Sequence, residues 1–143
     1  MRKKMAKLKT GDPAPAFEAV DQDGNMKTLA DYRGRKLILY FYPKDNTPGC
    51  TAEACSLRDG RDTLRRMGFE VVGVSPDSEK SHQGFIAKQG LNFTLLADTD
   101  KKIAEAYGVW GEKKFMGRTF MGILRTTFVI DEQGVIEKIF DKV

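Results

Sequence analysis

The chain has 143 residues, of which 41% are hydrophobic and 31% charged, with 14 glycines and five prolines. This length and apolar content suit one domain with an ordinary hydrophobic core and exclude disordered, collagen-like and low-complexity chains. The net charge is +4, but residues 1–9 hold five basic residues and no acidic one, which leaves 19 basic against 20 acidic residues elsewhere. We therefore expect no nucleic-acid partner.

Neither the N-terminal segment nor the apolar runs favour insertion into a membrane. Lysines interrupt the few apolar residues of segment 1–9, so the segment lacks the apolar core of a signal peptide. The longest apolar run, Leu37–Tyr42, is far shorter than the ~20 residues that span a bilayer. We expect a cytoplasmic protein with no membrane partner, a basic tail over 1–9 and a single domain over 10–143.

The first predicted elements are three strands. Two strand-like segments, 17–20 and 26–29, enclose the turn sequence Asp21-Gln22-Asp23-Gly24, and together they predict an N-terminal β-hairpin. The continuous aliphatic and aromatic run 36–42, ended by Pro43, predicts a central strand that is buried on both faces.

Strands and helices alternate through the middle of the chain. Apolar residues recur at helical spacing over 47–67, and Gly68 is expected to end that helix. The remaining elements of this region are predicted as a strand, a helix, a strand and a helix, over 70–74, 78–88, 93–96 and 101–107.

The C-terminal part predicts an antiparallel hairpin of strands 125–130 and 135–140, joined by the turn sequence 131–134. Segment 108–126 shows no clear strand or helix and is predicted to be a long ordered loop. The fold class is α/β: a central mixed β-sheet with parallel βαβ units at its centre, flanked by helices, with antiparallel edges and the N-terminal β-hairpin extension.

A cysteine lies where the predicted central strand gives way to a helix. Thr47 can act as the N-cap and Pro48 as the first helical residue, which places Cys50 in the first turn. The positive end of the helix dipole favours a thiolate there, and such sites lower a cysteine pKa from ~8.5 to between about 3.5 and 7.5. The alternative is that Cys50 is an inert, buried thiol beside an ordinary cap.

A second cysteine, Cys55, follows five residues after Cys50. In an intact helix the two Cα atoms would stand ~8.7 Å apart, whereas a disulfide allows about 7 Å at most. If the pair forms a disulfide, the first turns of the helix must unwind, and Gly60 is the expected downstream limit of the unwound segment.

These residues resemble those of the peroxiredoxins. Pro43, Thr47 and Cys50 match the family's P-x-x-x-T-x-x-C motif. The segments 47–55, 92–98 and 109–113 resemble the branch known as bacterioferritin comigratory protein or PrxQ. The resemblance covers roughly 8–143 and implies a thioredoxin-like fold and the reduction of hydroperoxides without a metal or other cofactor. Such proteins usually continue into a C-terminal helix, which is not evident before Val143.

The resemblance also implies a role for each motif residue. Cys50 matches the peroxidatic cysteine, which attacks a peroxide as a thiolate and becomes a sulfenic acid. Cys55 matches the resolving cysteine, which condenses with that acid to form a disulfide. Thr47 is expected to direct its hydroxyl at the peroxide and the thiolate, and Pro43 to shield the sulfur from water.

The same resemblance assigns two charged residues to the site. Arg125 matches the arginine that stabilises the thiolate and the departing oxygen, and Glu53 matches a glutamate that orients it. Without the resemblance to this family, Arg125 would be interpreted as an ordinary surface charge. Arg118 is a weaker candidate, supported only by its place in the long predicted loop.

The resemblance therefore implies a monomeric peroxidase that takes hydroperoxides as substrates and thioredoxin as reductant. Two other functions are compatible with the residues: a thiol-disulfide oxidoreductase, although such proteins typically carry C-x-x-C rather than this C-x4-C spacing, and a redox sensor whose disulfide alters a partner surface.

Three minor features have bland interpretations. We expect the single histidine, His82, to lie on a polar helix face, because no Cys or second His accompanies it as a metal ligand. Asp98 belongs to a sequence that predicts a helix cap rather than a calcium loop. A group of large apolar residues is expected to close the core under the long loop rather than form a peroxide pocket or partner surface: Trp110, Phe115, Met116 and Phe120.

Overall fold

The computed structural model describes residues 8–140, so residues 1–7, which carry most of the predicted basic tail, and residues 141–143 lie outside the described part. The elements in chain order are β1 (Glu18–Asp21), β2 (Met26–Thr28), the 3-10 helix η1 (Leu29–Tyr32), β3 (Lys36–Phe41), α1 (Pro48–Arg66), β4 (Phe69–Ser75), α2 (Glu79–Gln89), β5 (Thr94–Ala97), α3 (Lys102–Ala106), β6 (Trp110–Phe115), β7 (Arg118–Ile123), β8 (Thr126–Ile130) and β9 (Ile136–Phe140).

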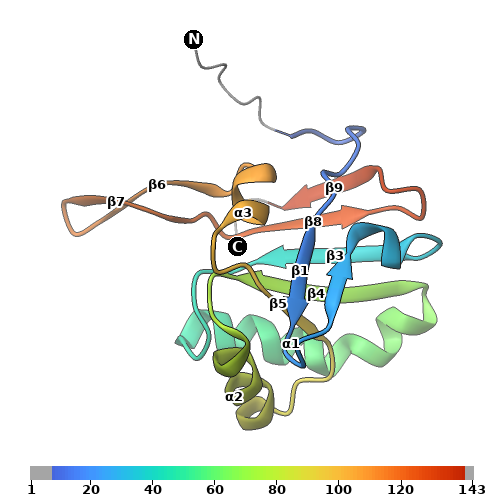
Figure 1. Ribbon diagram of the computed structural model, residues 1–143, viewed down its shortest axis with the longest axis horizontal. Coiled ribbons are helices and arrows are strands. Elements are labelled where there is room, and N and C mark those ends of the chain that lie inside the picture. Colours follow the sequence, from blue (N-terminus) through green and yellow to red (C-terminus); the bar gives the residue numbers. More distant parts are fainter. Residues whose placement is uncertain (1–7, 141–143) are drawn as a thin grey trace.

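Seven strands form one mixed sheet in the order β2-β1-β5-β4-β3-β8-β9 (Figure 1). The three central strands, β5, β4 and β3, run parallel, because α1 and α2 return the chain to the same edge after each strand. Both edges are antiparallel: β1 and β2 form the predicted N-terminal hairpin, and β8 and β9 form the C-terminal one. The predicted fold class is confirmed.

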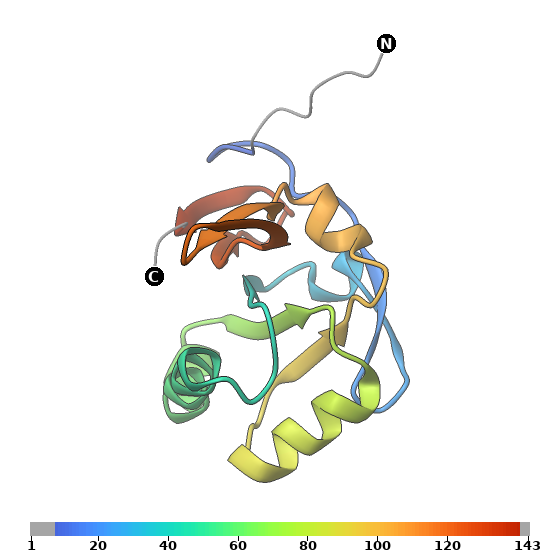
Figure 2. The ribbon, with the colours of Figure 1, turned by 90° about the vertical axis from the view of Figure 1, so that its left-hand side faces the viewer.

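The residues of β3 separate two hydrophobic layers. Leu37, Leu39 and Phe41 point towards the layer that contains α3. Tyr40, like Tyr42 just beyond the strand, points towards the layer covered by α1 and α2. Figure 2 shows α1 and α2 on one face of the sheet and α3 on the other. The alternation of a strand therefore places every second side chain of β3 beneath α1, where Cys50 lies.

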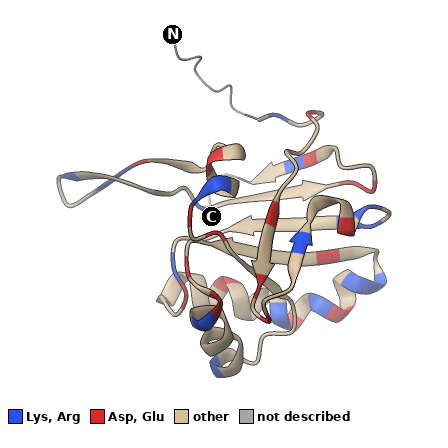
Figure 3. Ribbon diagram, in the orientation of Figure 1, with Lys and Arg blue, Asp and Glu red and all other residues tan. Residues whose placement is uncertain are grey.

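Local chemistry explains both ends of α1. Pro48 is its first residue, as predicted, and its fixed φ suits that position. Gly68 follows the C-cap with a φ of +89°, a conformation that glycine adopts without strain. Residues of both charge signs occur along α1 (Figure 3). No helix in the described part of the chain is long and apolar enough to cross a bilayer.

The expectation of a loop over 108–126 is wrong. Strands β6 and β7 form a separate two-stranded sheet, and the hairpin projects from the body of the protein (Figure 1). Its two-residue turn, Met116 and Gly117, has positive φ at both positions (+52° and +78°), as a tight hairpin requires. Methionine is an unusual residue for such a turn. Only Gly117 therefore indicated a hairpin turn in the sequence.

The hairpin also corrects the interpretation of its large apolar residues. Met116 is 84% exposed and Phe120 47% exposed, so neither closes the core. Trp110, at the start of β6, is half-buried and packs against the core layer that contains α3. The side chain of Phe115 is outside the described ones.

Candidate active site

Cys50 is the third residue of α1 and is only 1% exposed. It packs in a cluster with Tyr40, Tyr42 and Ala54, which are equally buried. Cys50 therefore belongs to the first turn of the helix, whose backbone N–H groups have no carbonyl partner within the helix. The predicted position of Cys50 in the first helical turn is confirmed.

Arg125 reaches Cys50 from the connection between β7 and β8. Its Nη2 donates to Cys50 Sγ at 3.1 Å, while its Nη1 donates to Glu53 Oε1 at 2.9 Å. One planar guanidinium therefore joins a sulfur and a carboxylate that lie one turn apart on α1. The structure brings together the three residues of the predicted site that the sequence could only propose as neighbours.

Partial burial affects the pKa values of both Arg125 and Glu53. The side chains of Arg125 and Glu53 are 25% and 14% exposed. Burial raises the pKa of Glu53 and outweighs the opposing effect of Arg125. Burial disfavours the charged guanidinium, but its bonds to Cys50 and Glu53 outweigh this effect and raise the pKa of Arg125. Arg125 therefore stays cationic and offers a fixed donor to negative charge on sulfur.

Thr47 and Pro43 lie on the turn that leads into α1. Thr47 has the extended backbone of an N-cap, as predicted, but its side chain does not accept from the first helical amides. Its hydroxyl instead donates to the carbonyl oxygen of Lys44 at 3.1 Å. The donated proton leaves the lone pairs of Oγ1 available to accept a hydrogen bond. Pro43 is half-buried directly after Tyr42.

Cys55 is half-buried on the same helix as Cys50, and both thiols are free. Its thiol faces Gln89 at the end of α2, with 3.6 Å between Sγ and Oε1. Because α1 is continuous through both cysteines, helical geometry separates their Cα atoms by ~8.7 Å. This arrangement cannot form a disulfide until the first turns of α1 rearrange.

Arg118, the weaker candidate, is exposed at the start of β7 near the hairpin turn. Its place in the projecting hairpin separates it from the connection that carries Arg125. Within the described chain, Arg118 forms no hydrogen bond or ion pair with the predicted site residues.

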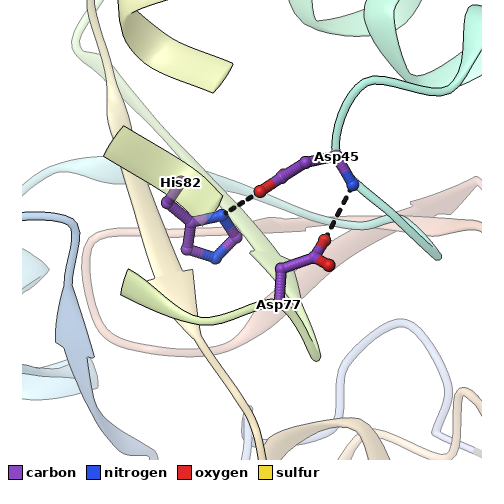
Figure 4. A group of neighbouring side chains, drawn as sticks. All are labelled: Asp45, Asp77 and His82. Carbon is purple, nitrogen blue, oxygen red and sulfur yellow. Dashed lines mark hydrogen bonds and ion pairs between the residues drawn. The ribbon is translucent and has the colours of Figure 1, made fainter. Parts of the chain in front are cut away.

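The expected location of His82 is wrong. His82 is fully buried, with 0% of its surface exposed, and its Nδ1 lies 2.8 Å from Asp45 Oδ2 (Figure 4). Asp45 belongs to the turn before α1, five residues before Cys50. The sequence showed an isolated histidine among polar residues of α2. Its partner is 37 positions away, so only the folded chain could reveal the pair.

Tyr40 is another functional neighbour that the sequence analysis missed. Its hydroxyl is buried and has no hydrogen-bond partner within the described residues. Burial, followed by the negative charges of Glu53 and Cys50, raises the pKa of Tyr40 well above its usual value. The phenol is therefore neutral and forms part of the apolar surroundings of Cys50.

One cluster in the described chain has the spacing of a metal site. Ligand atoms of Asp45, Asp77 and His82 lie within 4.8 Å of one another (Figure 4). Both ring nitrogens of His82 are already engaged, Nδ1 with Asp45 and Nε2 with the carbonyl oxygen of Leu96 at 2.9 Å. The donor set therefore fits a hydrogen-bonded network, and we derive no metal chemistry from it.

Comparison with known proteins identifies the family. The model of the AhpC/TSA family matches residues 10–139. The chain belongs to this family. It is 52% identical over 138 residues to a putative peroxiredoxin bcp of Haemophilus influenzae, covering 96% of this chain and 89% of that one. It is 50% identical over 137 residues to peroxiredoxin Bcp of Escherichia coli, covering 96% and 88%.

Solved structures of this peroxiredoxin branch share the fold. The bacterioferritin comigratory protein of Xanthomonas campestris superposes with a TM-score of 0.84 at 37% identity, covering 89% of this chain and 81% of that one. A PrxQ mutant of Xylella fastidiosa gives 0.90 at 35% identity, covering 97% and 89%. As a Bcp/PrxQ peroxiredoxin, the protein is an antioxidant thiol peroxidase of thioredoxin-like fold, acting on peroxides with a thiol reductant.

Proposed function

We propose that Cys50 is the peroxidatic cysteine, that Cys55 resolves its sulfenic acid as an intramolecular disulfide, and that thioredoxin reduces this disulfide. The contact of Arg125 with both Cys50 Sγ and Glu53 Oε1 carries the proposal. Simple thiol-disulfide exchange does not require a guanidinium fixed against the buried cysteine. Peroxide reduction does require such a donor, because negative charge develops on the leaving oxygen.

In the first step the Cys50 thiolate attacks the nearer oxygen of the hydroperoxide. The S–O bond forms as the O–O bond breaks, sulfur is oxidised to the sulfenic acid, and the peroxide is reduced to water or an alcohol after the departing oxygen takes a proton. Arg125 stabilises the thiolate and then the departing oxygen. Thr47 Oγ1 accepts a hydrogen bond from the peroxide O–H, because its own proton is donated to Lys44.

The second step closes the disulfide. The Cys55 thiol attacks the Cys50 sulfenic acid, an S–S bond forms, and water leaves. The intact helix holds the two residues too far apart, so the first turns of α1 must open before this step. Pro43, half-buried beside the turn, shields Cys50 from solvent until then.

The third step returns both thiols. A thioredoxin dithiol attacks the disulfide by exchange and leaves with its own cysteines oxidised. The Xanthomonas campestris relative is described with alkyl peroxide reduction activity, which supports organic hydroperoxides as substrates beside hydrogen peroxide. The cytoplasmic location and monomeric state expected from the sequence stay predictions.

The test is consumption of hydrogen peroxide coupled to thioredoxin and its reductase, with Cys50→Ser and Cys55→Ser beside the wild type. We expect Cys50→Ser to abolish turnover. Cys55→Ser should complete one oxidation of Cys50, visible as a stoichiometric burst, and then lose thioredoxin-supported turnover.

Turnover of Cys55→Ser at the wild-type rate would contradict the resolving role. Insulin reduction that is faster than peroxide reduction would instead support a thiol-disulfide oxidoreductase. Circular dichroism of each variant verifies that a lost rate does not come from a lost fold.

A further inference from the structure

The ring of His82 is enclosed by hydrogen-bond acceptors. Nδ1 faces Asp45 Oδ2 at 2.8 Å, and Nε2 faces the backbone carbonyl oxygen of Leu96 at 2.9 Å. Both ring nitrogens of His82 are therefore hydrogen-bonded, one to the turn before α1 and the other to β5. The contact between His82 and Asp45 is buried, with 0% and 1% of the two side chains exposed.

Asp45 gathers further donors around the same carboxylate. Tyr42 donates from its hydroxyl to Oδ1 at 2.6 Å, and Ser81 donates to Oδ2 at 2.8 Å. The backbone N–H of Asp45 donates to Asp77 Oδ2 at 2.7 Å. The titratable groups that face His82 are therefore Asp45 from the turn, Asp77 from the β4–α2 connection and Tyr42 from the end of β3, whose ring centroid lies 6.5 Å away.

This network fixes the turn before α1 to elements that carry neither cysteine. Through His82 and Ser81, Asp45 is attached to α2, and through the Leu96 carbonyl to β5. Asn46 follows with a φ of +64°, an uncommon conformation for a residue other than glycine. The next residue, Thr47, donates a hydrogen bond from its hydroxyl to the carbonyl oxygen of Lys44. The position of Thr47 therefore depends on a turn that Asp45 holds in place.

We propose that the Asp45–His82 pair is the upstream anchor of the segment that rearranges when Cys50 and Cys55 form their disulfide, and that His82 is a positioning residue for Thr47 and Cys50. The inference rests on the proposed roles of these residues. The anchor keeps the turn through Asp45 fixed in both redox forms and confines the opening of the chain to the segment after Asn46.

The hydrogen bonds of Asp45 explain why the chain should open after Asn46 and not before it. Every bond of Asp45 goes to Tyr42, α2 or the β4–α2 connection, so none of them has to break when Cys50 moves towards Cys55. Breaking the Asp45–His82 contact would leave Nδ1 of a fully buried ring without its partner, which is unfavourable. The first turn of α1 lacks a side-chain cap, so fewer hydrogen bonds stabilise this turn than stabilise the turn at Asp45.

The first experiment uses the wild-type protein and needs no turnover. His82 is the only histidine of the chain, so nitrogen NMR of the imidazole reads the hydrogen bonding of its ring without assignment ambiguity. We expect the two ring-nitrogen resonances to have the same positions in the reduced protein and in the disulfide form made with hydrogen peroxide, because both hydrogen bonds of the ring persist. A changed position of the Nδ1 resonance in the disulfide form overturns the proposal.

Hydrogen exchange on the same two samples locates the opening. The Asp45 amide, bonded to Asp77, should keep its protection in the disulfide form, whereas amides in the first turns of α1 should lose theirs. Loss of protection at Asp45 together with α1 overturns the anchor. This result does not depend on thioredoxin or on catalytic rates, so it separates failure of the anchor from failure of the proposed function.

The second experiment uses two amide replacements of His82. In His82→Asn the side-chain amide nitrogen takes the place of Nδ1 and can still donate to Asp45, whereas in His82→Gln it takes the place of Nε2 and can donate only to Leu96. We expect the rate constant for peroxide oxidation of Cys50 to fall roughly 10- to 100-fold in His82→Gln, because Thr47 and Cys50 lose their alignment. His82→Asn should retain more of the rate.

A matched control is Asp98→Asn. Asp98 is as buried as Asp45, but its carboxylate accepts from the amides of Ile103 and Ala104 at α3 and does not touch the turn. It should lower stability without changing the Cys50 oxidation rate. Equal rates in the two His82 variants, or a rate loss in Asp98→Asn as large as that in His82→Gln, overturn the positioning role.

Discussion

At the residue scale, one guanidinium determines how the environment of Cys50 differs from that of an ordinary buried thiol. The helix terminus offers partial positive charge to any group at this position, but Arg125 adds a full charge at 3.1 Å and is itself held by Glu53. Two donors on one rigid plane fix the direction of that charge. The family motif assigned Arg125 to the site although it would otherwise be taken for a surface charge. Its contact with Cys50 gives the physical reason for that assignment.

We predict that Arg125→Lys lowers kcat/KM for hydrogen peroxide by roughly 100- to 1,000-fold. A lysine keeps the charge but cannot bond to Cys50 and Glu53 in the same geometry. Stopped-flow oxidation of the reduced protein measures the effect. Arg118→Lys, on the projecting hairpin, is the matched control and should react at the wild-type rate; a large loss in the control would mean that the assignment of the two arginines is wrong.

Tyr40 permits a second prediction at this scale. Its hydroxyl is buried without a partner in the described chain, which costs free energy that a phenylalanine would not lose. Tyr40→Phe should therefore leave stability unchanged or raise the free energy of unfolding by about 1 kcal/mol. Urea denaturation gives the value. A loss of more than about 1 kcal/mol would show that the hydroxyl has a bonding partner, such as water.

At the element scale, the β6–β7 hairpin shows what the sequence signal lacked. Strand periodicity is weak there because β7 is exposed along most of its length, so no buried face enforces an alternation. The turn has a glycine at only one of its two positive-φ positions. The central strands of the main sheet were predictable because they bury side chains, and α1 because its apolar spacing, its proline and Gly68 agree.

Met116 supplies the prediction at this scale. A methionine at a φ of +52° is strained, whereas asparagine tolerates that conformation and forms the favoured Asn-Gly turn. Met116→Asn should stabilise the hairpin by about 1 kcal/mol. Slower exchange of the β6 and β7 amides would show this gain. Met116→Val, β-branched and harder to place at positive φ, should have the opposite effect; equal protection in both variants would contradict the argument.

At the scale of the whole molecule, the buried charges make stability depend on pH. Burial opposes the ionisation of Asp45, but hydrogen bonds from His82, Tyr42 and Ser81 outweigh it and hold its pKa below the usual 3.8. A lowered pKa in the folded state contributes stability above the unfolded pKa, and this contribution is lost as the pH falls through the folded value. Asp98 acts in the opposite sense, because burial raises its pKa.

We predict that Asp45→Asn lowers the free energy of unfolding at neutral pH by about 3 kcal/mol, because an amide cannot replace the buried carboxylate that bonds to His82, Tyr42 and Ser81. The difference from wild type should shrink as the pH falls below 3.8, where the wild-type carboxylate takes up its proton. Urea unfolding from neutral pH down to about pH 3 measures the difference. A difference that stays constant over this range would show that Asp45 is not ionised in the folded protein.

The sequence by itself determined the alternation of strands and helices, the parallel centre of the sheet, the start of α1 and the place of Cys50 in its first turn. These features depend on local periodicity, proline and glycine, which act between neighbours in the chain. Only the tertiary structure decided that Arg125 lies against Cys50 and that His82 is buried against Asp45. Each of these pairs joins residues far apart in sequence, and a charged or polar side chain carries no local signal of whether folding will enclose it with a partner.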